Sequence, residues 1–314
     1  MNLTGPIYPI MNLSRIILLL LILGNLSCTE KNSPGYTVQG DWKLDSINDQ
    51  KLERPIFFSF QDSSCAYLVP YGELTHFKII EDTLIIREKV KRRNDLVHGE
   101  KINYLFKIDS LTDDFLSIHP ITYESKSILN NYYTAKNNQL NLKKIKEKYH
   151  YDIKRVGFYS SACFGHCPSM YLEIDSDRNI FFNGVLYTEK TGFFSGSISE
   201  SEFEIIKKKI NSIDLKNIKK QYSASWTDDQ ECGVVVRTSN DVFRSNAYGF
   251  DQEPIELRAL FHKLMEVYKT AKLVPDTLTK YSFEFEAMAS LVKPFPPPPP
   301  LPSIENISME DDLP

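Results

Sequence analysis

The sequence predicts an α+β protein in which an antiparallel β meander or barrel precedes a two-layer sandwich of element order ββββαββα. Short apolar runs separated by turn residues fill positions 39–120, and two amphipathic helix patterns follow residue 198. Hydrophobic residues make up 42% of the 314 positions and aromatic residues 12%, which is enough to bury about two cores.

The net charge excludes one broad class of partner. The chain has 37 Lys and Arg against 41 Asp and Glu, which gives a formal charge of −4. Nucleic-acid binding depends mainly on neutralising phosphates with basic side chains. We therefore expect no nucleic-acid partner.

The N-terminus predicts export and a lipid anchor. Arg15 precedes an apolar run at 16–23, and the small residue Ser27 stands directly before Cys28. A cationic start, a short apolar core and a small residue describe a signal peptide over residues 1–27, with Met11 as the natural start. The pattern resembles a bacterial lipoprotein leader, with a departure at Asn25, where such leaders usually carry an aliphatic residue. The alternative is an ordinary secretory peptide with an incidental cysteine.

The lipoprotein resemblance implies where the mature chain lies. Cys28 would become its lipidated first residue, palmitate being one of the acyl chains, and several acyl chains hold a protein on a bilayer permanently. Thr29, in place of Asp, favours the outer membrane by the rule for enteric bacteria. Residues 28–38 are polar, contain Pro34 and Gly35, and are interpreted as a linker.

Residues 39–150 are predicted to form a β-rich domain. The expected strands lie at 56–60, 66–69, 76–80, 83–86, 102–108 and 115–118, and a closing strand lies near 140–145. The opening Gly40-Asp41-Trp42 and this strand rhythm resemble lipocalin-like domains of exported bacterial lipoproteins. We expect Trp42 to be a core residue rather than a ligand contact.

Residues 151–273 are predicted to form the α+β sandwich. Four strands are expected at 156–159, 170–174, 180–182 and 185–194, followed by a helix that Ser199 caps together with Glu202. A hairpin at 233–238 and 241–247 precedes a final helix with Pro254 in its first position. Its expected buried stripe comprises Leu257, Leu260, Phe261, Leu264 and Tyr268. Residues 274–314 are rich in proline and are expected to form an extended, mostly disordered tail.

The most distinctive motif is Cys163-Phe164-Gly165-His166-Cys167-Pro168. With the strands and helices around it, this motif resembles a bacterial domain of unknown function, family 6438, over about residues 152–272. The chain departs from the family pattern after Asp228, where members commonly carry a Pro-Thr pair. The resemblance implies no established reaction, and it agrees with an exported lipoprotein.

Two chemistries are open to this motif. An oxidising compartment and a short loop favour a structural disulfide between Cys163 and Cys167. The alternative is a periplasmic thiol or soft-metal module in which Cys163, His166 and Cys167 bind Cu(I) or Zn, with Cys232 as a fourth ligand only if the fold brings it there. Pairing Cys65 with Cys232 would cross the predicted domain boundary, so both are expected to be unpaired and buried.

The functional hypothesis is a membrane-anchored envelope lipoprotein that acts in binding or scaffolding and is not an enzyme. The sequence contains no recognised nucleophile, phosphate-loop, zinc-hydrolase or dinucleotide motif, and no cofactor is expected. The acidic residues Asp228, Asp229 and Glu231 are interpreted as a solvated loop. The expected partners are the membrane, through the lipid anchor, and an envelope protein or small ligand that the sequence does not identify. The chain is expected to be monomeric.

Overall fold

The computed structural model describes residues 37–47, 50–67, 75–90, 100–130, 139–277, 281, 283 and 284. The predicted signal peptide, Cys28 and most of the proline-rich tail lie outside these residues. No helix in the described ranges is long and apolar enough to cross a membrane.

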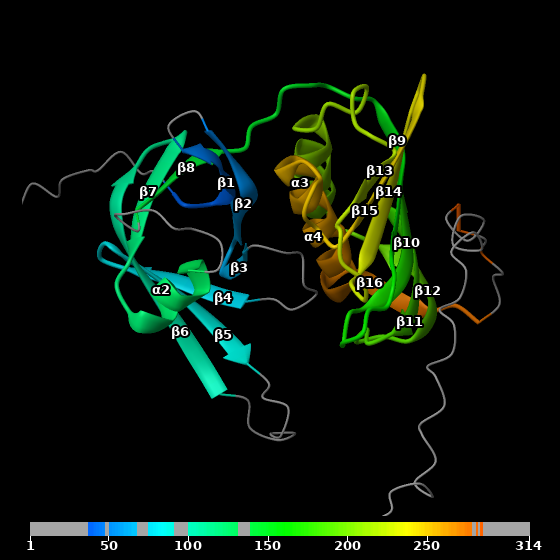
Figure 1. Ribbon diagram of the computed structural model, residues 1–314. Helices are drawn as coiled ribbons and strands as arrows, with labels where there is room; N and C mark the ends of the chain where they lie inside the picture. Colours follow the sequence, from blue (N-terminus) through cyan, green and yellow to red (C-terminus); the bar gives the residue numbers. More distant parts are fainter. Residues whose placement is uncertain are drawn as a thin grey trace, which may run out of the picture. The chain divides into compact units, whose positions relative to one another are not determined.

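The N-terminal domain is a closed antiparallel β-barrel, as Figure 1 shows in blue to green. Neighbouring strands in sequence pair with one another, and the first strand closes the barrel by pairing with the last through Trp42–Lys144 and Lys43–Lys143. The strands are β1 (Gly40–Ile47), β2 (Gln50–Gln61), β3 (Ser64–Tyr67), β4 (Thr75–Ile80), β5 (Thr83–Val90), β6 (Glu100–Leu111), β7 (Phe115–Pro120) and β8 (Leu140–Lys144).

Aromatic side chains fill the barrel core. Trp42 is fully buried, and its indole nitrogen donates to the carbonyl oxygen of Val38 at 2.6 Å. The ring of Phe58 packs against Phe60 and Phe106, with ring centres 5.9 and 6.1 Å apart. The prediction that Trp42 is a core residue is therefore confirmed. The short helix α2 (Tyr123–Asn130) was not predicted, because its stretch reads as a polar connector.

The C-terminal domain is a single sheet with both of its helices on one face (Figure 1). The order across the sheet is β13-β15-β14-β9-β10-β11-β12-β16, and every neighbouring pair is antiparallel except β13 with β15. The strands are β9 (Ile153–Ser160), β10 (Ser169–Asp175), β11 (Asn179–Leu186), β12 (Gly192–Ser197), β13 (Gln221–Ser223), β14 (Glu231–Thr238), β15 (Val242–Tyr248) and β16 (Lys272–Pro275). The helices are α3 (Glu200–Asn211) and α4 (Ile255–Thr270).

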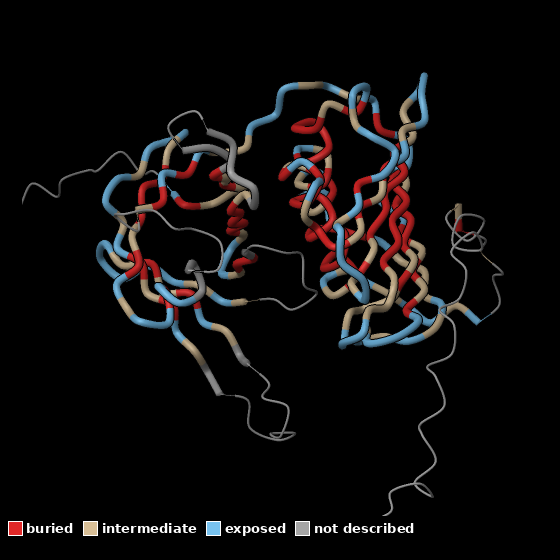
Figure 2. The backbone as a smooth tube through the Cα atoms, viewed as in Figure 1, coloured by how far each residue is buried: buried red, intermediate tan, exposed pale blue. Residues whose placement is uncertain are grey.

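The core of this domain lies between the sheet and the two helices, where Figure 2 shows the buried stretches in red. Alternate strand residues such as Phe158, Leu172 and Val234 point inward and are at most 2% exposed. The predicted helical stripe meets them, since Leu257, Leu260, Phe261, Leu264 and Tyr268 are all buried. None of the helices in the described residues lies on the opposite face of the sheet.

The caps of the two helices follow local sequence. The hydroxyl oxygen of Ser199 accepts a hydrogen bond from the backbone nitrogen of Glu202 at 3.2 Å, as the capping motif predicts. Pro254 is the residue before α4 rather than its first helical position. The difference is one residue, and a proline tolerates both places because neither requires its missing N–H group.

The predicted class is confirmed in outline, and several details are corrected. The expected order ββββαββα lacks the short strands β13 and β16, which have three and four residues and therefore no readable alternation. The expected strand at 185–194 is wrong, because residues 185 and 186 end β11 and a turn precedes β12. The domain also continues beyond residue 273, since Val274 and Pro275 pair with β12.

Candidate functional site

The Cys-Phe-Gly-His-Cys-Pro motif forms an exposed loop between β9 and β10. Cys163 and Cys167 are joined by a disulfide, with their Cα atoms 5.6 Å apart. Between them, Phe164 is 87% exposed, and the backbone nitrogen of Gly165 donates to the sulfur of Cys163 at 3.2 Å. The disulfide makes a tight loop that holds a large apolar ring in water.

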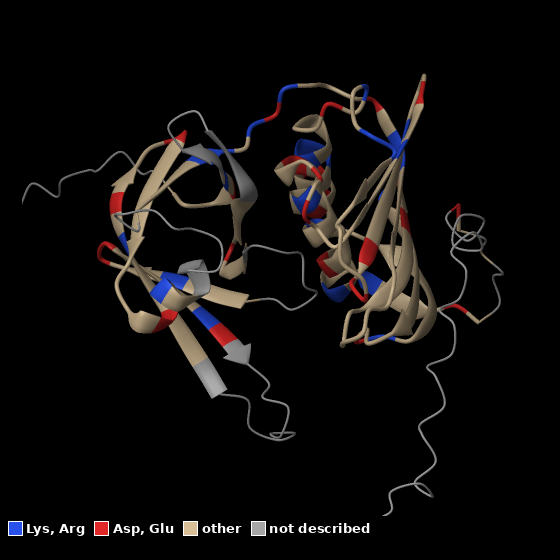
Figure 3. Cartoon of the chain, viewed as in Figure 1, with Lys and Arg blue, Asp and Glu red and all other residues tan. Residues whose placement is uncertain are grey.

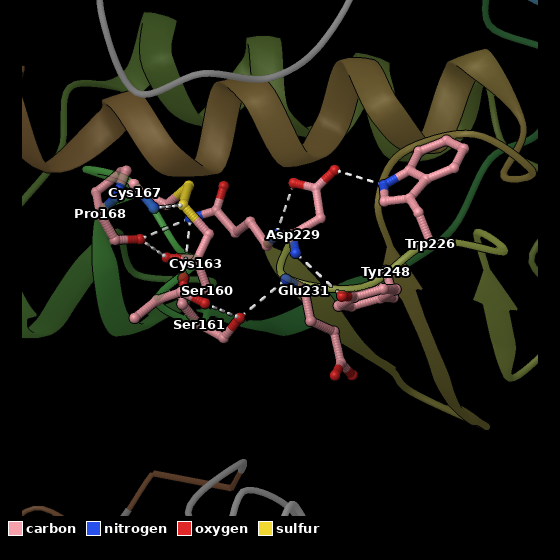
Figure 4. The surroundings of a disulfide bond; sticks show 12 residues. Ser160, Ser161, Cys163, Cys167, Pro168, Trp226, Asp229, Glu231 and Tyr248 are labelled. Atoms are coloured by element: carbon pink, nitrogen blue, oxygen red, sulfur yellow. Dashed lines mark hydrogen bonds between the residues drawn. A yellow bond between two sulfur atoms is a disulfide. The ribbon is translucent and has the colours of Figure 1, made fainter. Parts of the chain in front are cut away.

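The two ends of this loop are tied together by the side chain of Gln230. Its amide nitrogen donates to the carbonyl oxygens of Ser161 at 3.1 Å and Pro168 at 2.8 Å, and the residue is only 2% exposed. The hydroxyl of Ser160 donates to the same Pro168 oxygen at 2.6 Å (Figure 4). Buried hydrogen bonds of this kind fix a loop because leaving either carbonyl without a donor costs free energy.

A second loop, at residues 224–230, lies beside the first. The backbone nitrogen of Phe164 donates to the carbonyl oxygen of Asp228 at 3.1 Å. The indole nitrogen of Trp226 donates to a carboxylate oxygen of Asp229 at 2.9 Å, and the Asp229 backbone nitrogen donates to the phenol oxygen of Tyr248 at 3.0 Å. These contacts hold Trp226, which is 36% exposed, at the same end of the sheet as Phe164.

The three acidic residues of this region do not form a shared site. The carboxylate of Asp229 accepts from Trp226 and from the backbone nitrogen of Gln230, whereas the side chain of Glu231 points the other way (Figure 4). A carboxylate oxygen of Glu231 accepts from the phenol of Tyr159 and from the side-chain amide of Asn246, both at 2.5 Å. Burial and this bond to Glu231 raise the pKa of the Tyr159 phenol.

His166 packs against an aromatic ring. Its imidazole lies edge-on to Tyr187 in the turn between β11 and β12, with ring centres 4.9 Å apart. Tyr187 is 51% exposed. Within the described residues, no group of three or more His, Cys, Asp or Glu side chains is arranged to hold a metal ion. Cys232 and Cys65 are free and buried, as predicted, and burial raises the pKa of both thiols.

Three exposed aromatic residues therefore gather at one end of the sheet, and we call Phe164, Tyr187 and Trp226 the aromatic rim. They come from three different connections, and hydrogen bonds or ring contacts hold each of those connections. An exposed aromatic cluster on a constrained scaffold suits recognition, since large rigid rings bind with little loss of conformational entropy.

Comparison with protein families assigns the part of the chain that carries this rim. A model of the domain of unknown function DUF6438 matches residues 154–268. The C-terminal domain is a DUF6438 domain. The match begins in β9 and ends in α4, so it contains the disulfide loop, the aromatic rim, the helix α3 and most of α4. It confirms the family resemblance, with bounds narrower than the expected 152–272. Comparison with curated proteins and with solved structures found no match.

Sequence reasoning found the disulfide loop but missed the residues that support it. Gln230 stands among acidic residues in the sequence. Its side-chain amide donates to two carbonyl oxygens that lie 62 and 69 positions earlier in the chain, so no local pattern indicates its role. Trp226 carries a weak signal, since it is one of only two tryptophans in the chain. The Tyr159–Glu231 pair carries no signal in the sequence, because the two residues come from different strands.

Proposed function

We propose that this protein is a lipid-anchored envelope protein whose DUF6438 domain binds a protein partner through the aromatic rim, without catalysing a reaction. The exposure of Phe164 at the tip of the disulfide loop carries the proposal, because an 87% exposed phenylalanine contributes nothing to the core. Aromatic residues dominate the binding energy of many interfaces when a partner desolvates them.

The barrel is less suited to hold a small ligand in its centre. Among its described residues, Trp42, Phe58, Phe60, Phe106 and Leu116 are at most 2% exposed, so side chains occupy that core. The resemblance to lipocalin-like domains therefore supports a barrel architecture in the proposal, but we do not propose a ligand inside the barrel. We assign the barrel a spacing or scaffolding role.

Site-specific photo-crosslinking in cells tests the rim. A photoreactive amino acid at position 164 or 226 should give the same crosslinked partner band. Position 242, near the other end of the same sheet, is the matched control, because Val242 is 39% exposed and Trp226 is 36% exposed. The absence of a band from positions 164 and 226, or an equal band from position 242, would contradict the proposal.

The lipid anchor requires a separate test. The variant Cys28→Ala should shift the protein from the membrane fraction to the soluble envelope fraction and abolish labelling with a palmitate analogue. Cys65→Ala is the control, since that cysteine is buried in the barrel. Continued acylation of Cys28→Ala would remove the anchor from the proposal without affecting the rim.

A thiol function is the second candidate, and one contact favours it. The Gly165 backbone N–H at 3.2 Å from the Cys163 sulfur would stabilise a thiolate there after reduction. A partner dithiol would reduce the disulfide by becoming a disulfide itself, while Cys163 and Cys167 gain one hydrogen each. With His166, the reduced pair would also supply the three ligands of the predicted soft-metal site. Equilibration with glutathione buffers separates the candidates, since a redox module requires a disulfide that is readily reducible in its compartment.

A further inference from the structure

The face of the DUF6438 sheet that carries no helix has an unusual composition, and we call it the open face. Strand alternation places Tyr159, Tyr171, Phe181 and Phe193 on it, on the four consecutive strands β9, β10, β11 and β12. A solvent-facing side of an antiparallel sheet usually carries polar residues. Strands β11 and β12 contain no charged residue at all, and the sheet is mostly tan in Figure 3.

Three residues from the far end of the chain lie on this aromatic surface, and we call Tyr281, Phe283 and Glu284 the tail triplet. Phe283 is 2% exposed, and its ring centre lies 5.8 Å from that of Tyr171. The ring of Tyr281 stacks on Phe181 at 4.2 Å with an interplanar angle of 6°. These residues fall within the region 274–314 that the sequence predicts to be mostly disordered, so that prediction is wrong for them.

Charged groups of the sheet contact the phenol of Tyr281 and both the carboxylate and the backbone nitrogen of Glu284. Glu173, itself 2% exposed, accepts from the phenol of Tyr281 at 2.5 Å and from the backbone nitrogen of Glu284 at 2.7 Å. Arg237 donates two hydrogen bonds to the carboxylate of Glu284, at 2.9 and 2.8 Å, and Arg244 donates a third. A paired guanidinium fork of this kind selects a carboxylate by its geometry.

With the tail triplet in place, the carboxylate of Glu173 is buried and takes hydrogen bonds from the triplet. A buried carboxylate is costly unless donors surround it. Among the described residues, two donors to Glu173 come from the tail triplet, and a third is the Arg155 guanidinium at a longer 3.4 Å. The family match ends at residue 268, before the triplet, whereas Glu173, Arg237 and the four aromatic residues lie inside it. These residues of the open face therefore lie within the matched domain, whereas the tail triplet lies beyond it.

We propose that the open face is a binding site for a short protein segment with the pattern Tyr-x-Phe-Glu, and that the chain's own tail triplet occupies it in cis. A partner segment of the same chemistry takes the site only when the triplet leaves. Because an attached segment acts at an effective concentration in the millimolar range, the cis contact excludes weak competitors. The site is separate from the aromatic rim and does not depend on the function proposed for it.

Peptide binding to the full chain tests this proposal. The probe is a synthetic peptide of residues 277–287 with a fluorescent label, and binding is measured by anisotropy. The full-chain variant Tyr281→Ala/Phe283→Ala/Glu284→Ala empties the site and should bind the peptide, whereas the wild-type chain should bind it at least about 10-fold more weakly. A peptide with Phe283→Ala should lose about 30-fold in affinity, as hot-spot residues do.

The receptor side has a matched pair of substitutions. Added to the emptied variant, Arg237→Ala should weaken binding about 10-fold or more, because it removes the two hydrogen bonds that Arg237 donates to the Glu284 carboxylate and leaves the one from Arg244. Lys154→Ala should not change it, since Lys154 pairs with Asp152. The proposal is overturned if the emptied variant does not bind the peptide, if wild type binds it equally well, or if the Phe283→Ala peptide binds as tightly as the unaltered one.

Hydrogen exchange provides a test that leaves the tail unaltered, should the emptied variant fail to fold. The Glu284 amide donates to Glu173, so its exchange in the wild-type chain should be slowed and should accelerate about tenfold or more in Glu173→Gln, which weakens that acceptor. Lys154→Ala should leave it slow. Exchange of this amide at the rate of an unstructured chain in wild type would overturn the proposal.

Discussion

Glu173 accepts a hydrogen bond from the phenol of Tyr281, a residue 108 positions further along the chain, at 2.5 Å. The acceptor lies in the middle strands of the DUF6438 sheet, and the donor lies beyond the last strand. A contact at this separation ties the segment after the domain to the domain's open face. It also makes the ionisation of one tyrosine report on whether that segment is bound.

The first prediction concerns pH. Burial, and then the hydrogen bond to Glu173, raises the pKa of Tyr281 above its ordinary value. Because the pKa of Tyr281 is higher in the folded state, its contribution to the stability of that state is fully present below the ordinary value of about 10. This contribution is lost as the pH rises through the folded-state pKa of Tyr281. NMR of ¹³C-labelled tyrosine should show Tyr281 still protonated at pH 10.5. In Phe283→Ala/Glu284→Ala it should titrate near 10, and titration near 10 in the wild-type chain would contradict the prediction.

The second prediction concerns Gln230. Replacing it with alanine leaves the carbonyl oxygens of Ser161 and Pro168 without its amide donor, so we expect a loss of about 1–3 kcal/mol in the free energy of unfolding. Urea denaturation followed by circular dichroism measures it. Gln252→Ala is the control, because Gln252 is exposed and its side-chain amide donates to the neighbouring Asp251, and its effect should stay within about 0.5 kcal/mol. Equal effects in the two variants would show that Gln230 does not hold the loop.

Gln230 also shows how far the sequence alone predicts this protein. Elements with strong local signals were predictable: the Ser199 cap, the α4 stripe, the barrel strands after β1 and the Cys163–Cys167 loop each depend on residues close together in the chain. The features that complete the site and the open face depend on pairing across the sheet. Glu173 and Tyr281 are unremarkable in sequence, and only the register of the strands brings the aromatic residues of four strands together. Periodicity within one segment cannot supply that information.

The third prediction concerns the disulfide. The bridge closes a loop with a sequence separation of only 4, so chain entropy limits its contribution to about 2 kcal/mol. The variant Cys163→Ser/Cys167→Ser should therefore fold, with a midpoint of urea denaturation slightly below that of wild type. The yield of the crosslink from position 164 should fall clearly even though the variant stays folded, because the bridge shapes the aromatic rim more than it stabilises the domain. Undiminished crosslinking in the folded serine variant would show that the bridge does not position Phe164.

The last prediction concerns Gly233, which lies opposite Tyr159 in the pairing of β14 with β9. A Cβ atom at Gly233 would come within 2.2 Å of a ring carbon of Tyr159, so Gly233→Ala should displace that ring and its hydrogen bond to Glu231. Overpacking of this kind costs about 1–3 kcal/mol. Tyr159→Ala removes the clash, and in that background Gly233→Ala should be neutral or stabilise by about 0.5–1 kcal/mol, since alanine loses less conformational entropy than glycine. Additive effects in this double-mutant cycle, measured by urea denaturation, would show that the glycine is not there to make room for the tyrosine ring.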